Sequence, residues 1–165
     1  MFCKHCGNEL KDTHAFCINC GAKVTADTVV ASPARKLKTN KSLLKYILLS
    51  LITLGIYPLV VMTSVSTSIN YAASRYDGKN TMNFCLMAFL LNPITLGIAS
   101  IVWYHKVSAR IGDELIRRNI DYKFNSASYW LWNVLGSFII VGPFIYAHKL
   151  FTATNKICEH YNIYG

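Results

Sequence analysis

Three long stretches with almost no charge constrain this chain more than any other feature of its sequence. They span about residues 43–63, 82–104 and 127–147, and Lys45 is the only charged residue in them. The first two contain the same five residues, ITLGI, at 52–56 and again at 94–98. About 20 apolar residues in a helix are enough to cross the roughly 30 Å hydrocarbon core of a bilayer. The pattern therefore predicts an all-α integral membrane domain made of three related hydrophobic units.

The composition and the position of the basic residues support a lipid environment. Of 165 residues, 53% are hydrophobic and only 15% are charged, whereas soluble domains carry about 25% charged residues. A basic cluster next to an apolar span typically faces anionic headgroups. Nucleic acid is the competing explanation of excess positive charge, but the position beside the first run accounts for the cluster without it. The predicted membrane-surface cluster consists of Arg35, Lys36, Lys38, Lys41 and Lys45.

Residues 1–24 contain two C-x2-C pairs, which is the ligand spacing of a zinc ribbon. Cys3, Cys6, Cys17 and Cys20 are the expected ligands, since four thiolates suit tetrahedral Zn²⁺. Four thiolates leave no open position for water, so the zinc is expected to be structural. His5 and His14 are expected to remain outside the coordination shell. Reduced thiols place this end in the cytosol, and residues 1–40 lack the apolar core of a cleavable signal peptide.

Residues 25–41 are rich in Thr, Ala, Ser and Lys, with Pro33 near the middle. They show no sustained period of 2 or 3.6, which is typical of a flexible linker. The expected organisation is therefore a zinc ribbon at 1–24, a basic linker at 25–41 and a membrane domain at 42–165. A protein partner for the ribbon, a bilayer with anionic headgroups for the domain and a homo-oligomer are the expected associations.

Each apolar run also contains a glycine or proline break, and an amphipathic stretch follows it. The breaks are Gly55 with Pro58, Asn92-Pro93, and Gly142-Pro143; glycine favours a helix stop and proline a helix start. The amphipathic stripes suit either the membrane interface or packing against neighbouring units, and both interpretations stay open. The stripes consist of Val65, Ile69, Ala73 and Tyr76; Val107, Ile111 and Leu115; and Leu150, Ile157 and Tyr161.

Two topologies fit the three runs. In the favoured one each run crosses once, with the amino terminus inside and most basic connecting residues inside, as the positive-inside rule requires. The inside loop would hold Lys106, Arg110, Arg117, Arg118 and Lys123, and the outside loop Arg75 and Lys79. In the alternative each run folds as two half-helices, a hairpin that enters and leaves on one side.

The knuckles at 1–24, the two ITLGI segments and Gly142-Pro143 together resemble a family of small bacterial membrane proteins. These proteins carry a domain of unknown function with recurring TLGIY-type segments, often behind a zinc ribbon. The second copy departs from the pattern at Ala99-Ser100, where the first has Tyr57-Pro58. The resemblance implies a multi-pass membrane location and three hydrophobic segments, and it implies no activity.

Catalytic signatures do not emerge from the sequence, so the chain is not expected to be an enzyme. No acidic residue lies inside an apolar run, which disfavours an ion-coupled transporter. His105 and His148 occupy equivalent positions and form a candidate headgroup or metal pair, although each more simply ends an apolar run. The leading hypothesis is a non-catalytic scaffold or partner-binding module. A small channel, transporter or lipid-binding protein is the alternative, because helix breaks at membrane depth often mark binding sites.

Overall fold

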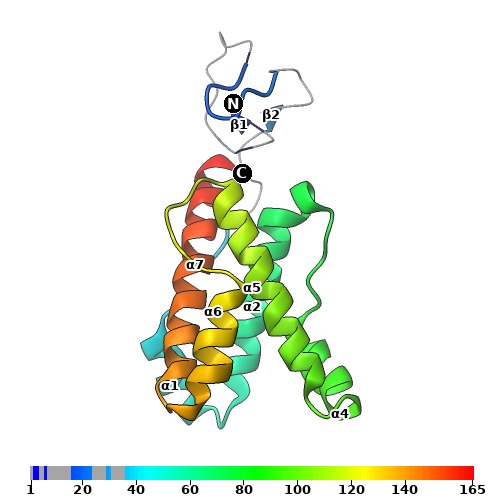
Figure 1. Cartoon of the computed structure of the whole chain (residues 1–165), viewed down its shortest axis with the longest axis vertical. Coiled ribbons are helices and arrows are strands. Elements are labelled where there is room, and N and C mark those ends of the chain that lie inside the picture. The colour runs from blue at the N-terminus through cyan, green and yellow to red at the C-terminus, as the bar shows by residue number, and fades with distance from the viewer. Residues whose placement is uncertain (1, 4–5, 7–15, 24–28, 31–35) are drawn as a thin grey trace.

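The computed structural model describes residues 2–3, 6, 16–23, 29–30 and 36–165 (Figure 1). Two short strands, β1 (Phe2–Cys3) and β2 (Val29–Val30), pair antiparallel, with Cys3 opposite Val29. Strand β2 falls within the expected linker at 25–41, so the amino-terminal unit continues past residue 24.

The helical part consists of three hairpins, each with a shorter first arm, a turn and a long returning helix (Figure 1). The first hairpin contains α1 (Leu43–Ile52) and α2 (Ile56–Asp77). The second contains α3 (Phe84–Leu86), the π-helical η1 (Met87–Leu91), α4 (Asn92–Ile94) and α5 (Ile98–Arg117). The third contains α6 (Ser126–Ser128), the π-helical η2 (Tyr129–Val134), the 3-10 helix η3 (Leu135–Phe138) and α7 (Gly142–Tyr164). All three turns lie at the lower end of the molecule in Figure 1.

The two ITLGI segments form the same turn. Leu54 and Gly55 have φ of 50° and 88°, and Leu96 and Gly97 have φ of 50° and 93°. Two successive residues in the left-handed region reverse the chain at once, and only glycine adopts that region without a steric penalty. The repeated pentapeptide is therefore a helix-breaking turn in both places.

A threonine in each ITLGI turn links the helix before the turn to the helix after it. Thr53 Oγ1 donates to the Leu49 carbonyl at 2.6 Å and accepts the Tyr57 N–H at 2.9 Å. Thr95 makes the equivalent bonds, to the carbonyl four residues before it at 2.8 Å and from the N–H four residues after it at 3.0 Å. The carbonyl before each turn also accepts the threonine's own N–H, at 2.9 Å in both turns, so the hydroxyl's distinct contribution is to cap an otherwise open N–H at the start of the next helix.

The third turn depends on a close approach of two glycines. A Cβ atom on Gly142 would overlap the carbonyl group of Gly136. The Gly142 N–H donates to the Ile139 carbonyl at 2.8 Å. Pro143 follows in the first turn of α7, where its missing N–H has no helical partner to lose.

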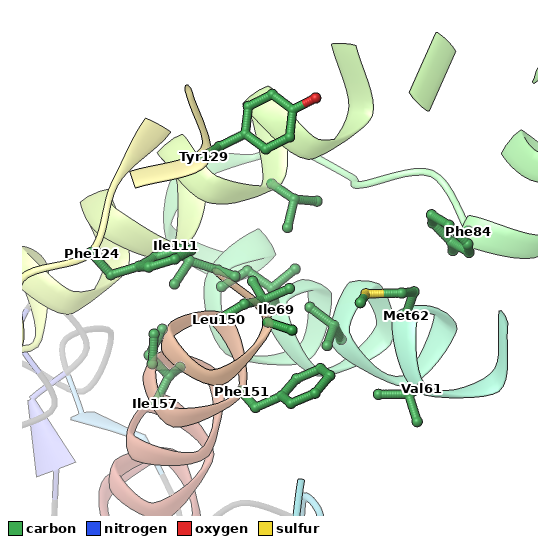
Figure 2. Packing of buried hydrophobic residues seen from close by; sticks show 14 of the residues in the cluster. Val61, Met62, Ile69, Phe84, Ile111, Phe124, Tyr129, Leu150, Phe151 and Ile157 are labelled. Atoms are coloured by element: carbon green, nitrogen blue, oxygen red, sulfur yellow. The ribbon is translucent and has the colours of Figure 1, made fainter. Parts of the chain in front are cut away.

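The hydrophobic core lies mainly between α2, α5 and α7 (Figure 2). Its most buried aliphatic side chains come from the stripes expected after each apolar run, so the packing interpretation of those stripes is confirmed. Each is at most 1% exposed: Val65, Ile69, Val107, Ile111, Leu115, Leu150 and Ile157.

Within the described residues, no helix combines the length and the apolar character needed to cross a membrane. The predicted integral membrane domain with three spans is therefore wrong. The turns are the physical reason: α1 ends after 10 residues, about 15 Å of helix, which is half the hydrocarbon thickness. The other two runs are divided in the same way, at 95–97 and 139–141. Each run folds as two helical arms joined by a turn, which is the hairpin arrangement of the alternative topology.

The last residues of the expected linker are hydrogen-bonded to α7. The amide of Asn162 accepts the Leu37 N–H at 2.6 Å and donates to the Leu37 carbonyl at 2.8 Å. Asn155 pairs with the backbone of Lys41 in the same way, at 3.2 and 2.8 Å. Residues 37–41 are thus fastened along α7, because two asparagine side chains replace the backbone partners that a coil would find in water.

Candidate metal centre and surfaces of the helical domain

The four expected cysteine ligands converge on one point. Their Sγ atoms all lie within 4.8 Å of one another. The Cys3–Cys20 and Cys6–Cys17 sulfur pairs are 3.6 and 3.5 Å apart. Four sulfurs about 2.3 Å from a tetrahedral Zn²⁺ are about 3.8 Å from each other. None of the four forms a disulfide, so the donor set and its spacing fit zinc.

The second knuckle shows how the local sequence shapes the site. The Cys17 N–H donates to the Ala22 carbonyl at 2.7 Å, and the Gly21 N–H donates to the Cys17 carbonyl at 2.8 Å. Gly21 has φ of 72°, the left-handed conformation expected for the glycine after a knuckle. Phe16 and Lys23 close the loop as an antiparallel bridge. His5 and His14, expected to stay outside the shell, lie outside the described residues.

The two thiols of this knuckle ionise differently. At Cys17 burial opposes ionisation, but the backbone N–H groups of Cys20 and Asn19 outweigh it and lower the pKa to about 7. At Cys20 the loss of water around the sulfur raises the pKa to about 12, and hydrogen bonds with the other thiols act in the same direction. Zinc takes only thiolates, so metal binding must release protons here.

The members of the predicted basic cluster differ in exposure. Lys36, Lys38 and Lys45 are exposed, but the Lys41 Nζ turns inward and donates to the Lys38 carbonyl at 3.0 Å and to Ser68 Oγ at 3.3 Å. Burial lowers the pKa of Lys41. Arg35 lies outside the described residues.

His105 and His148, a candidate pair, are not brought together as a metal site. Both are exposed, and the only metal-type cluster among the described residues is the four cysteines. His105 Nδ1 instead accepts the indole N–H of Trp130 at 3.1 Å. The histidine therefore ties α5 to η2 at the surface.

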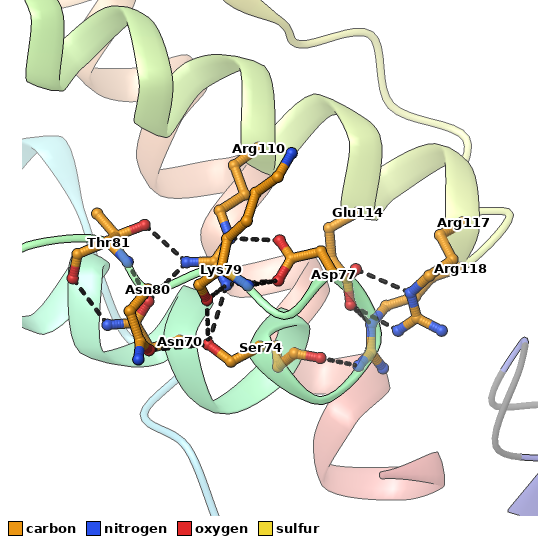
Figure 3. A network of polar contacts seen from close by, with 11 residues as sticks. Asn70, Ser74, Asp77, Lys79, Asn80, Thr81, Arg110, Glu114, Arg117 and Arg118 are labelled. Atoms are coloured by element: carbon orange, nitrogen blue, oxygen red, sulfur yellow. Dashed lines mark hydrogen bonds and ion pairs between the residues drawn. The ribbon is translucent and has the colours of Figure 1, made fainter.

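A polar network around one buried arginine joins the end of α2 and the segment after it to α5 (Figure 3). Its centre is Arg110, 8% exposed, which pairs with Asp77 at 2.6 Å. Burial alone would raise the pKa of Asp77, but this guanidinium and the Lys79 N–H lower it below its ordinary value. The remaining guanidinium hydrogen bonds go to Asn70 Oδ1, Thr81 Oγ1, Ser74 Oγ and the Lys79 carbonyl, at 2.6 to 3.0 Å.

Glu114 lies between two arginines at the end of the same helix. Its carboxylate contacts both Arg117 and Arg118 at 2.6 Å. The Arg118 side chain is fully buried and also donates to the carbonyls of Ala72 and Gly165. Its Nη1 lies 2.9 Å from His160 Nδ1. Burial, followed by the charge of Arg118, lowers the pKa of His160 to about 4.

Sequence reasoning missed this network. Arg110, Arg117 and Arg118 were expected in an inside loop, whereas they belong to α5 and its end and are bonded to α2 and α7. The partners are far apart in sequence, since Asp77 and Arg110 are separated by 33 positions. A buried arginine is expected to be paired, but only the fold reveals the partner.

Two further surfaces lie nearer the turns. A groove of about 620 Å³ runs along α5; its lining changes from Lys79, Lys106 and Arg110 to the apolar Leu91 and Val102. Exposed apolar side chains cover the three turns themselves. We call this surface, formed by residues 51–56, 94–98 and 138–141, the apolar end; it contains no charged residue. Leu54 and Leu96 are each 93% exposed and Phe138 is 88% exposed.

Comparisons with known proteins identify two units in the chain. Residues 2–24 match the zinc-ribbon domain family. With the four converging cysteines, this establishes an amino-terminal zinc ribbon with a structural zinc. Residues 41–113 match a domain of unknown function, DUF4234. This match includes the first hairpin and α5 as far as Asp113, but not the third hairpin. No curated protein and no solved structure matches the chain.

Proposed function

We propose that this protein is a non-catalytic binding module whose zinc ribbon contacts a protein partner. Four thiolates complete the coordination of Zn²⁺ and leave no site for water or substrate. The metal's contribution is then to hold a surface in shape, because a unit this small buries too little apolar area to fold unaided. The cytosolic position of the ribbon stays a prediction from its reduced thiols.

The observation that carries the proposal is the exposure of two apolar side chains beside a zinc ligand. Phe16 and Ile18 flank Cys17 and are 58% and 75% exposed. The described buried residues of the ribbon are Cys3, Cys6 and Cys17, with Ala22 packed against them. Aromatic and aliphatic anchors at the centre of a small rigid surface are typical of protein interfaces. Residues 37–41, fastened to α7, connect this surface to the helical domain.

Quantitative capture of partners by the full chain tests the proposal. A Phe16→Ser/Ile18→Ser variant should keep its zinc and lose the partners that the original chain retains. Lys23→Ser, at the exposed residue bridged to Phe16, should retain them. Cys17→Ser/Cys20→Ser should lose both zinc and partners. Identical partner sets for the original chain and the Phe16→Ser/Ile18→Ser variant, with zinc content unchanged, would refute the proposed binding surface.

A further inference from the structure

The two leucines at the tips of the ITLGI turns are unfavourable for a surface that faces water. Leu54 and Leu96 have φ of 50° and are 93% exposed. The left-handed region disfavours leucine and favours glycine or asparagine. Asparagine would therefore stabilise a water-facing turn in two ways, because it tolerates the left-handed backbone and because its side chain is well solvated. Leucine at both positions is understandable if the tips lie in an apolar medium.

The first backbone N–H groups of the helices that follow these turns are bonded inside the protein. At the start of α2, the Ile56 N–H donates to the Thr53 carbonyl at 3.1 Å and the Tyr57 N–H to Thr53 Oγ1 at 2.9 Å. The next residue, Pro58, has no N–H. The second turn bonds its first three N–H groups internally as well, at Ile98, Ala99 and Ser100. At the helix starts, these N–H groups meet the requirement for internal bonding that hydrocarbon imposes.

Charge is ordered by distance from the turns. Moving away from the turns, the first charged residue of α1, α5 and α7 is a lysine in each case: Lys45, Lys106 and Lys149. Each lies about 10 to 12 Å along its helix from the turn, at 1.5 Å per residue. The first acid on α5, Asp113, is about 22 Å from the start of that helix. Trp130, 44% exposed, bonds to His105 at the level of Lys106, and tryptophan prefers the boundary between lipid and water.

We propose that the apolar end docks into one leaflet of a bilayer that carries anionic headgroups. The hydrocarbon part of one leaflet is about 15 Å deep, a few ångströms more than the uncharged length below the three lysines, and a lysine side chain is long enough to cover that difference. In this position no helix crosses the bilayer, and the lysines reach the headgroups. The groove along α5 combines basic and apolar residues in the same way. Lys79 and Lys106 line its polar part, and Leu91 and Val102 line its apolar part.

Lipid fits this surface better than a second copy of the chain. The turn at α4 stands apart from the other two turns (Figure 1), so the apolar end is divided, and acyl chains adapt to a divided surface. A dimer needs one continuous complementary face. The basic residues nearest the turns also have no acidic counterparts at the same level, so a second copy in contact there would bring like charges together.

Flotation of the full zinc-loaded chain with vesicles tests the proposal. The vesicles are phosphatidylcholine alone, or phosphatidylcholine mixed with phosphatidylglycerol. The Leu54→Asn/Leu96→Asn variant should partition at least about a hundredfold more weakly, from the loss of two buried leucines. Ile116→Asn is the matched control, because Ile116 is 81% exposed but lies near the far end of α5; its partition should stay within about twofold. Asparagine suits φ of 50°, so the double variant should fold and its thermal midpoint reports this directly.

Three results would overturn the proposal. One is equal vesicle binding by the original chain and the folded double variant. Another is a change from dimer to monomer in the double variant with vesicle binding unaltered, which would assign the surface to self-association. The third concerns depth: lipids brominated on their acyl chains should quench a tryptophan at Leu96→Trp strongly and one at Ile116→Trp weakly. Equal quenching of the two would exclude docking by the turns.

The headgroup part of the proposal has its own variant. Lys106→Gln/Lys149→Gln should weaken binding to the vesicles with phosphatidylglycerol and reduce its dependence on salt. Binding to phosphatidylcholine alone should be unchanged. If the two lysine substitutions leave the phosphatidylglycerol preference intact, the anionic headgroup requirement is wrong.

Discussion

Neutralising Glu114 should destabilise the helical domain strongly. Its carboxylate is 5% exposed and contacts the side chain of Arg118, which is fully buried, at 2.6 Å. Glu114→Gln keeps the shape of the side chain but leaves the guanidinium buried without its counter-charge. Removing one partner of a buried ion pair costs about 3 to 5 kcal/mol. Arg118 retains two carbonyl acceptors, so we expect the lower value, about 3 kcal/mol.

Urea unfolding followed by circular dichroism measures this effect. With a slope of about 2 kcal/mol per molar urea, Glu114→Gln should lower the midpoint by about 1.5 M. Asp113→Asn is the matched control, since it removes the same charge from the exposed neighbouring residue and should cost less than about 0.5 kcal/mol. A second replacement, Arg118→Met, should recover part of the loss, because it removes the stranded charge. Equal midpoints for Glu114→Gln and Asp113→Asn would refute the burial argument.

Three further predictions follow from the fold. Gly142→Ala should destabilise by about 2 kcal/mol or more, because its Cβ overlaps Gly136; Gly78→Ala, with φ of 64° but open space, should cost about 1 kcal/mol, and equal thermal midpoints would contradict the close approach. Between pH 6.5 and about 4 the unfolded chain binds a proton at His160 that the folded chain excludes; stability should therefore fall as the pH drops through this window, and His160→Gln should flatten that slope in urea titrations. Chelation should remove one zinc per chain and abolish the dispersed NMR signals of the ribbon while the helical circular dichroism persists; loss of both signals together would show that the ribbon supports the helical domain.

The sequence was most informative where neighbouring residues determine the structure. Cys3, Cys6, Cys17 and Cys20 converge as their spacing predicts, since two residues between cysteines suffice for a knuckle. Gly55 and Gly142 mark chain reversals, as a glycine before a helix start suggests. These features depend on short-range chemistry, which a single sequence carries in full.

The prediction of three membrane spans was wrong because the hydropathy of each apolar run was counted as one helix, although a turn divides the run. The run at 43–63 is long enough to cross a bilayer only if Leu54 and Gly55 continue the helix, and their left-handed backbone prevents it. Long-range pairing was the other failure. Arg110 and Arg118 were counted as loop charges, since the partners that neutralise them, such as Asp77 and the Ala72 carbonyl, are identified only once α2 and α5 pack together.

Two asparagines of α7 join the segment before α1 to the carboxyl-terminal helix. Leu37 is 125 positions from Asn162, and Lys41 is 114 positions from Asn155. A force applied to the ribbon would therefore be transmitted to α7 before it is transmitted to α1. Removing the residues from Asn162 to the carboxyl terminus would release Leu37 from α7 without changing any residue of the ribbon.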